Sequence, residues 1–214
     1  MKFLPVEGVR IGVARAGIRY PDRRDLVIME IAEGSHCVAM FTRNAFCAAP
    51  VSVAKAHLDV AMPRYLVINT GNANAGTGHL GISDAKATCT AVADLTGCRA
   101  DEVLPFSTGV IGEPLPLSRL LAGLPTALAD LRQEGWIEGA WGIMTTETRP
   151  KLASRRISIA GHDIAVTGIA KGAGMIRPDM ATMLAFVATD AGLAPGLLRH
   201  CLEDAVAVSF NAIT

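Results

Sequence analysis

Apolar runs separated by short polar stretches predict several β-strands along the chain. Asp25–Ile31 and His36–Phe41 are rich in Val, Ile and Met, and the stretch Ala32–Ser35 between them predicts a hairpin turn. Tyr65–Asn69 is a short apolar run that leads into a polar, glycine-rich segment. This order indicates a buried strand that feeds a loop.

The last third of the chain predicts a second hairpin and one further strand. Arg156–Ala160 and Ile164–Ile169 are strand-like and flank the turn residues Gly161–Asp163. Met183–Thr189 is another apolar run of strand length. Several strands are therefore expected to pair with a close neighbour in the sequence.

Three segments predict helices. Ser83 is a suitable first residue for a helix that runs to about Leu95, and Gly97 is a suitable stop. Leu117–Glu134 predicts a second helix, interrupted near Pro125. Pro195 opens a third, whose buried face is expected to carry Leu198, Leu202, Ala205, Val206 and Ser209. This mixture of helices, strands and hairpins favours a mixed α+β or layered α/β fold.

Composition narrows the class of protein. The chain has 214 residues, of which 50% are hydrophobic, 19% charged and 5% aromatic. It is therefore expected to fold around a sizeable core of Ala, Val, Leu, Ile and Met. The net charge of zero gives no general attraction to nucleic acid or anionic lipid, and no uncharged apolar run approaches the ~20 residues of a membrane span.

Cysteine, histidine and the N-terminal sequence point to a cytoplasmic protein without a metal. The five cysteines form no CxxC pair, and their odd number favours reduced thiols. Residues 1–22 contain no apolar segment typical of a secretion signal. The five histidines are scattered and form no HExxH motif, so neither a metal nor a cofactor is predicted.

Two glycine-containing segments have the composition of a site but allow a plainer interpretation. Asn69–Gly78 follows a predicted strand, yet it lacks the patterns of nucleotide-binding loops, so it is either an irregular surface loop or a loop that supports a site. Thr108 and Gly109 place a hydroxyl beside a glycine N–H, a pair of donors that can form an oxyanion hole. The same dipeptide is common in ordinary turns.

Two further segments carry candidate substrate-binding and nucleophilic groups. Gly142–Pro150 contains three threonines and two charges, which suit either a polar substrate or a solvated loop. Lys171 lies among small residues, where its ammonium could reach a carboxylate. Thr182 begins an apolar strand after a glycine-rich segment, as nucleophiles of self-processing hydrolases do, although threonine commonly begins strands for its β-propensity alone.

Taken together, these segments closely resemble the ornithine acetyltransferase family, also called bifunctional glutamate N-acetyltransferase/amino-acid acetyltransferase. The matching segments follow the family's order and cover nearly the whole chain: Ala16–Ile18, Asn69–Ala75, Ser107–Gly112, Gly142–Pro150, Lys171–Leu184 and Ser209–Asn211. One small departure is Glu147, which stands where the family frequently has Asp.

The resemblance implies a self-cleaving precursor with a threonine nucleophile. The scissile bond would be Ala181–Thr182, and Thr182 would become both the first residue of the β chain and the nucleophile. Thr108 and Gly109 match the family's oxyanion hole.

The resemblance also implies which residues bind the substrate and how the chain is organised. Thr145 and Lys171 match substrate-binding positions, and Thr182 contacts the substrate as well. The implied fold is a layered αββα sandwich, in which residues 1–181 belong to the α chain and residues 182–214 begin the β chain. Together they form one intertwined catalytic domain.

The implied activity belongs to arginine biosynthesis. The acetyl group of N-acetylornithine would pass to glutamate by a ping-pong route through an acetyl-threonine, and it stays open whether acetyl-CoA also serves as donor. A threonine hydroxyl needs a base, and the α-amine freed by cleavage has a reference pKa of ~7.7–8.0, close to working pH. The implied partners are these small molecules and the α and β chains of a heterotetramer, without metal or cofactor.

Two alternatives remain at this point. One is a related self-processing amidase or aminopeptidase with an N-terminal nucleophile. The other is an inactive fragment, since family members continue past Thr214 and their remaining β chain supplies further substrate contacts.

Overall fold

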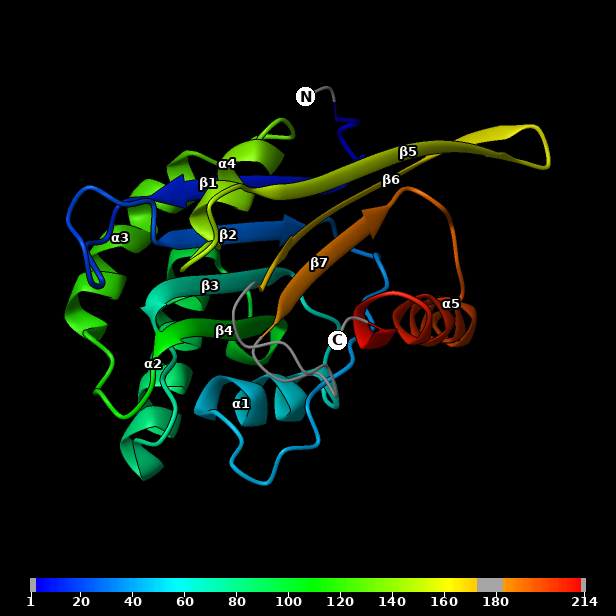
Figure 1. The fold of residues 1–214 in the computed structure, drawn as a ribbon. Helices are drawn as coiled ribbons and strands as arrows, with labels where there is room; N and C mark the ends of the chain where they lie inside the picture. The colour runs from blue at the N-terminus through cyan, green and yellow to red at the C-terminus, as the bar shows by residue number, and fades with distance from the viewer. Residues whose placement is uncertain (1–2, 173–182, 213–214) are drawn as a thin grey trace.

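Two β-sheets lie face to face in the computed structural model, which describes residues 3–172 and 183–212 (Figure 1). The first sheet has the strand order β1-β2-β3-β4, and the second has the order β5-β6-β7. The strands of the first sheet are β1 (Val9–Ala14), β2 (Leu26–Ile31), β3 (Tyr65–Asn72) and β4 (Val103–Val110). Those of the second are β5 (Lys151–Ile159), β6 (His162–Lys171) and β7 (Leu184–Thr189).

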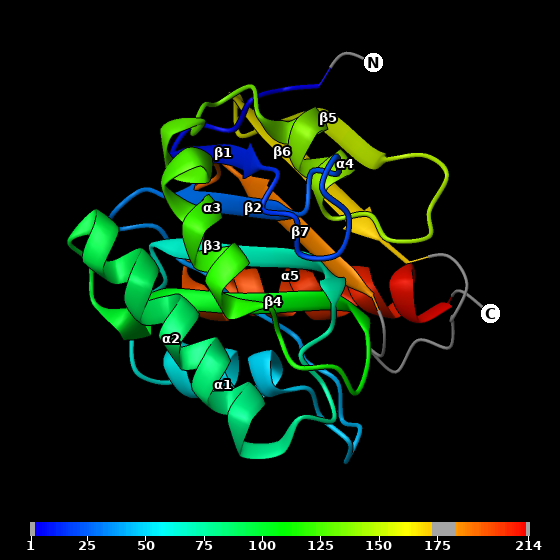
Figure 2. The ribbon, with the colours of Figure 1, turned by 90° about the vertical axis from the view of Figure 1, so that its left-hand side faces the viewer.

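Helices complete the layers on both sides of the two sheets. The α-helices are α1 (Ala49–Leu58), α2 (Gly78–Thr96), α3 (Leu117–Ala129), α4 (Trp136–Gly142) and α5 (Pro195–Ala207), and the 3₁₀ turns are η1 (Ala100–Glu102) and η2 (Phe210–Ala212). Helices α2 and α3 cover the outer face of the first sheet, and α5 lies on the far side of the second (Figures 1 and 2). The mixed α+β class and the layered order are thus as predicted.

Two hydrophobic clusters fill the spaces between the layers. One packs α2 and α3 against the first sheet and includes Ile28, Val67 and Leu124. The other lies between the sheets and includes Ile68 and Phe186 as well as parts of α4. Each large aliphatic side chain that is fully buried contributes about 1.5–3 kcal/mol to stability. Burial of aliphatic side chains therefore holds the sheets together without many aromatic residues.

Most predicted elements are confirmed, with one strand as the clear exception. Strands β2, β3 and β7, the β5–β6 hairpin and helix α5 lie close to the predicted places, and Gly97 ends α2 in a left-handed conformation. Helix α2 begins at Gly78, five residues before Ser83, so the predicted start of this helix is wrong. The strand expected at His36–Phe41 is absent. Strand β2 pairs with β1 on one edge and with β3 on the other, so no edge of β2 remains for a hairpin partner.

The predicted helix Leu117–Glu134 is wrong at two points. Pro125 lies inside a continuous helix, which ends at Ala129. The chain leaves the helix there because Arg132 and Ile11 exchange backbone hydrogen bonds of 2.9 and 3.2 Å along the free edge of β1. The buried face of α5 is also narrower than predicted. Val206 is buried, whereas Ala205 and Ser209 are exposed.

Gly12 on β1 allows α3 to approach the first sheet closely. A Cβ atom at this position would lie 2.0 Å from the carbonyl oxygen of Ala127 and 2.9 Å from the backbone nitrogen of Leu131. Gly12→Ala is therefore expected to push α3 outward and to lower the free energy of unfolding by about 1–3 kcal/mol, measured by urea denaturation.

Gly196 is the matched control, because a Cβ there meets no atom within 4 Å. Gly196→Ala should change stability by no more than about 0.5 kcal/mol. Equal effects of the two substitutions would show that the close approach at Gly12 does not limit packing.

Candidate active site

Parallel pairing of β3 with β4 brings two polar strand ends together. Thr70 lies opposite Thr108, and Gly71 lies opposite Gly109. The register shifts beyond Gly71, so the ends form an irregular, bulged edge. Such bulges change the direction of the backbone and its N–H groups at the end of a sheet.

Gly109 has a backbone conformation that requires glycine. Its φ angle is +142°, and a Cβ atom would lie 2.3 Å from the carbonyl carbon of Gly71. The residue is nevertheless exposed at the end of β4. Gly109 therefore lies on an accessible strand end next to Thr108 in the sequence, which is compatible with the predicted pair of donors.

Asparagines of the Asn69–Gly78 segment form a buried support beneath this edge. Asn69, Asn72 and Asn74 are at most 4% exposed. The Asn69 amide donates to the carbonyl of Asn72 at 2.9 Å, and Ser107 donates to the Asn69 side-chain oxygen. The Asn72 amide donates to two carbonyls of the chain that follows β4. Of the two interpretations left open, this network favours a loop that supports a site.

Lys171, at the end of β6, meets Thr108 from the opposite sheet. Its Nζ atom donates a hydrogen bond to the Thr108 Oγ1 atom at 3.1 Å. The Lys171 side chain is only 6% exposed. Two residues that the sequence selected separately are thus in direct contact across the space between the sheets.

Glu147 joins the same group and was not predicted as a site residue. Its Oε1 atom lies 3.5 Å from the Lys171 Nζ atom, and its side chain is 2% exposed. Its Oε2 atom accepts a 2.6 Å hydrogen bond from the backbone N–H of Thr145. Glu147 therefore connects the predicted substrate residues Thr145 and Lys171.

Burial and charge act in opposite directions on this pair. Burial lowers the pKa of Lys171, and the neighbouring Glu147 carboxylate offsets part of that effect. Burial would raise the pKa of Glu147, but backbone N–H groups, among them that of Thr145, together with Lys171 bring it below its ordinary value. The Glu147 carboxyl is accordingly held as a carboxylate, and it faces the Lys171 side-chain nitrogen.

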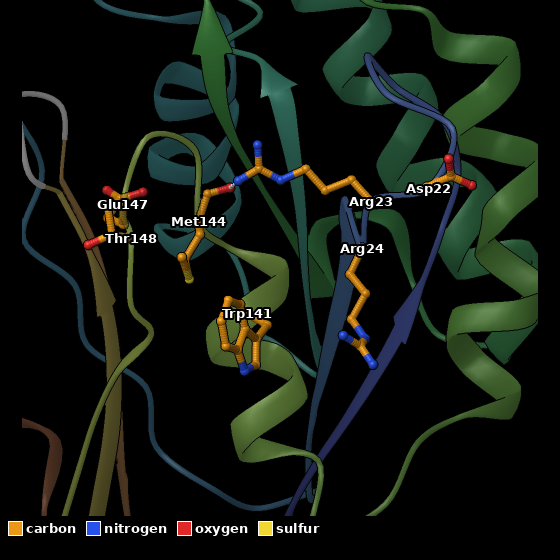
Figure 3. A pocket seen from close by; sticks show the side chains of 7 residues that line it. All are labelled: Asp22, Arg23, Arg24, Trp141, Met144, Glu147 and Thr148. Atoms are coloured by element: carbon orange, nitrogen blue, oxygen red, sulfur yellow. Dashed lines mark hydrogen bonds between the residues drawn. The ribbon is translucent and has the colours of Figure 1, made fainter.

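Arg23 fixes the segment that carries Thr145. One of its guanidinium nitrogens donates to the carbonyl oxygens of Met144 and Thr145, both at 2.8 Å. Figure 3 shows Arg23 reaching across to Met144 from the loop before β2. Asp25, at the end of this loop, accepts backbone hydrogen bonds from Ala16 and Ile18 and keeps the loop folded.

A cavity of about 330 Å³ lies between this loop and the end of α4. Figure 3 shows its lining residues, which are Asp22, Arg23, Arg24, Trp141, Met144, Glu147 and Thr148. Glu147 belongs both to this lining and to the buried group around Lys171. The cavity therefore borders the candidate site.

Ala181 and Thr182, the predicted cleavage site and nucleophile, lie outside the described residues. The described chain on both sides of them is anchored at the candidate site. Lys171 on β6 is the register partner of Leu184 on β7. Gly172 and Met183 flank the undescribed segment.

Two other kinds of site are not found in the part of the chain that the structure describes. Residues 3–172 and 183–212 contain no cluster of three or more His, Cys, Asp or Glu side chains able to hold a metal ion. No helix within these ranges has the length and apolarity needed to cross a membrane.

Glu147 and Arg23 were not predicted as site residues, because no motif in the neighbouring sequence distinguishes them from other charged loop residues. Each is one charged residue in a loop. The partner that joins Glu147 to the site, Lys171, is 24 positions away, and Met144, a partner of Arg23, is 121 positions away. For Glu147, the only available signal was its place among the threonines of the Gly142–Pro150 segment.

Gly109 provides a test of the bulged edge. Gly109→Ala combines an unfavourable φ with a steric clash, so it should lower the free energy of unfolding by about 1–3 kcal/mol. Gly112 is the matched control, because it also has a positive φ, +83°, but a Cβ there meets no atom within 4 Å.

The Gly112→Ala variant should lose less stability than Gly109→Ala in thermal and urea denaturation. An equal loss in both variants would mean that the φ angle alone, and not the contact with Gly71, requires glycine at position 109.

The chain is similar in sequence to proteins of arginine biosynthesis. The chain is 59% identical over its whole length to the arginine biosynthesis bifunctional protein ArgJ of Methylococcus capsulatus, and 53% identical over 98% of its length to the protein of that name from Pseudomonas syringae. It spans 52% of each relative, about half of their length.

Solved structures of similar proteins share the fold. A bifunctional ArgJ protein from Bacillus halodurans matches with a TM-score of 0.74 and 29% identity, over 84% of this chain and 92% of that one. An ornithine acetyltransferase from Mycobacterium tuberculosis, solved in complex with ornithine, matches with a TM-score of 0.70 and 32% identity, over 86% of this chain and 94% of that one.

A more distant protein shares the fold alone. It is an aminopeptidase from Ochrobactrum anthropi, described as a variant of the Ntn hydrolase fold, with a TM-score of 0.50 and 13% identity over 96% of this chain and 69% of that one. The ArgJ family model matches residues 10–214. With this match over nearly its whole length, the chain belongs to the ArgJ family.

Proposed function

We propose that the protein transfers the acetyl group of N-acetylornithine to glutamate, with Thr182 as the nucleophile. The observation that carries the proposal is the 3.1 Å contact between Lys171 and Thr108, residues 63 positions apart in the sequence. The contact brings Lys171, which is expected to bind substrate, to Thr108, which is expected to stabilise an oxyanion. An ornithine complex of a family relative supports ornithine as one of the substrates.

The nucleophile is generated by cleavage of the Ala181–Thr182 bond. In the precursor, the Thr182 hydroxyl attacks the carbonyl carbon of Ala181, the peptide becomes an ester, and water then hydrolyses it. The freed α-amine serves as the base for the neighbouring hydroxyl, because its reference pKa of about 7.7–8.0 lies near working pH.

Acetyl transfer then proceeds in two half-reactions. The Thr182 oxygen attacks the acetyl carbonyl while its proton passes to the α-amine. The bond from the acetyl carbon to the ornithine nitrogen breaks, and that nitrogen takes the proton as it leaves. The amine of glutamate next attacks the acetyl ester, restores the Thr182 hydroxyl and leaves as N-acetylglutamate.

Thr108 and Gly109 supply the two donors for the oxyanion of each half-reaction. The hydroxyl and the neighbouring N–H lie at the same bulged strand end, held by the β3–β4 pairing. Donors fixed in advance by folding need no reorganisation when charge develops, which makes them effective in a site shielded from water.

Lys171 and Thr145 bind the substrate's charged and polar groups. An ammonium group has three N–H donors. Within the described residues, one is directed to Thr108 and one faces Glu147, so a third is available to a substrate carboxylate. Glu147 and Arg23 hold Thr145 from two sides.

Further parts of the proposal extend to the whole protein. The name bifunctional, given to the relatives, suggests acetyl-CoA as a second donor, which would add amino-acid N-acetyltransferase activity to glutamate N-acetyltransferase activity. The α and β chains assemble as a heterotetramer of two copies of each in the cytoplasm. No metal or cofactor takes part.

Thr182→Ala in the full-length protein tests the nucleophile. The variant should remain uncleaved in an intact mass spectrum and should transfer no acetyl group from N-acetylornithine to glutamate. Thr126→Ala is the control, since Thr126 is an exposed position on α3. A Thr182→Ala protein that cleaves and transfers acetyl would contradict the mechanism, and an active wild type that only hydrolyses amides would identify an amidase instead.

Thr108→Val tests the oxyanion hole, because valine keeps the shape of threonine and removes its hydroxyl. The loss of one donor should lower kcat by about 10²–10³-fold in steady-state assays. Thr108→Ser restores a hydroxyl and should recover most of this loss. A Thr108→Val enzyme with wild-type kcat would exclude the hydroxyl from the oxyanion hole.

A further inference from the structure

The contact between Lys171 and Thr108 determines which hydrogen bonds the Thr108 hydroxyl can make. An ammonium group only donates, whereas a hydroxyl has one donor and two acceptor positions. In the 3.1 Å contact, the Thr108 oxygen must therefore accept. Its single O–H proton is directed away from Lys171 and is available to another acceptor.

Lys171 directs the Thr108 proton in this way only when it is charged, and its burial opposes the charge. The residue is buried, and burial favours the neutral amine. A neutral amine has a lone pair and could accept a hydrogen bond from the Thr108 hydroxyl. The O–H bond would then point at Lys171 and would be lost to the oxyanion hole.

Glu147 is the group that opposes deprotonation of Lys171. Three charged side chains act on Lys171 within the described residues: Glu147 from the segment before β5, Lys151 from β5 and Arg23 from the loop before β2. The two cations, Lys151 and Arg23, lower the pKa of Lys171, whereas the Glu147 carboxylate raises it. Both cations also donate to backbone carbonyls, Lys151 to Gly172 and Arg23 to Met144 and Thr145.

The two oxygens of the Glu147 carboxylate have different partners. Oε2 receives the N–H of Thr145, whereas Oε1 is buried, receives no hydrogen bond from the described residues and lies 3.5 Å from the Lys171 Nζ atom. One carboxylate therefore fixes the substrate segment and faces the ammonium group at the same time.

We infer that Glu147 is a positioning residue: through Lys171, it directs the Thr108 hydroxyl proton toward the oxyanion. This inference rests on the proposed function and adds a residue to it. Among the described residues, Glu147 makes no hydrogen bond to Thr108 and reaches it only through Lys171. It acts by keeping the hydrogen-bond donor of the oxyanion hole in the correct direction.

Glu147→Gln in the full-length protein tests the inference. Glutamine keeps an oxygen that accepts the Thr145 N–H, but it removes the charge that faces Lys171. Because burial then acts on Lys171 without a counter-charge, Lys171 should lose its proton at lower pH. The alkaline limit of kcat should move to lower pH by about 1–3 units, and kcat at pH 8 should fall about 10–100-fold.

Two further variants separate this role from a structural one. Glu147→Asp keeps the charge, so its alkaline limit should stay near that of the wild type even if the shorter side chain lowers kcat. Glu138→Gln, on α4, removes the charge of another partly buried glutamate, one paired with Arg132 at 3.4 Å, and should leave the pH profile unchanged.

A measurement without substrate keeps the inference separate from the proposed function. The pKa of Lys171 is read by NMR of lysine side chains, with the signal assigned by its loss in Lys171→Met. A lower pKa in Glu147→Gln than in the wild type supports the inference. An unchanged pKa, or an unmoved alkaline limit in an active enzyme, overturns it. A wild-type protein that transfers no acetyl group refutes the proposed function instead.

Discussion

The parallel pairing of β3 with β4 is the constraint on which the candidate site depends. Two parallel strands cannot be joined by a tight turn, so the chain crosses back through the 19-residue helix α2. The crossover places both carboxyl ends at one edge of the sheet. Thr108 and Gly109 lie there, beside the buried asparagines that hold the bulge.

The second sheet and the segment before it add a buried charged pair to the site. Lys171 comes from the end of β6, and Glu147 comes from the segment that leads into β5. Two charges buried together cost desolvation energy, and their attraction offsets this cost only when the remaining donors and acceptors are satisfied. The Thr145 N–H and the Thr108 oxygen each provide one such partner, whereas Oε1 of Glu147 faces Lys171 without a hydrogen bond from the described residues.

The sequence alone predicts the elements whose pattern is local. Strand β3, the β5–β6 hairpin and the end of α2 at Gly97 each follow from apolar runs or turn residues within a few positions. Strand β1 was not predicted, because Gly12 interrupts its apolar pattern. Glycine is needed there because α3 packs too closely to leave room for a Cβ atom. The strand expected at His36–Phe41 does not form. Both edges of β2 are taken by β1 and β3, and such pairing between distant segments leaves no local pattern in the sequence.

The candidate site divides in the same way. Thr108, Gly109, Thr145 and Lys171 were predicted from the resemblance of short motifs to a family, and three of them are linked by contacts through Lys171 and Glu147. Glu147 and Arg23 could not be found by local pattern, since each matters through a distant partner. Ala181 and Thr182 stay predictions.

The pairing of β6 with β7 has a consequence for the proposed cleavage. The two strands share six register pairs, which run from Val166 opposite Thr189 to Lys171 opposite Leu184. A cut between positions 181 and 182 would assign β6 to one polypeptide and β7 to another. The two products would then remain joined as neighbouring strands of one sheet, and separating them would require unfolding that sheet. Maturation would thus change the covalent structure of the protein, and the pairing of β6 with β7 would hold the two chains together without a peptide bond.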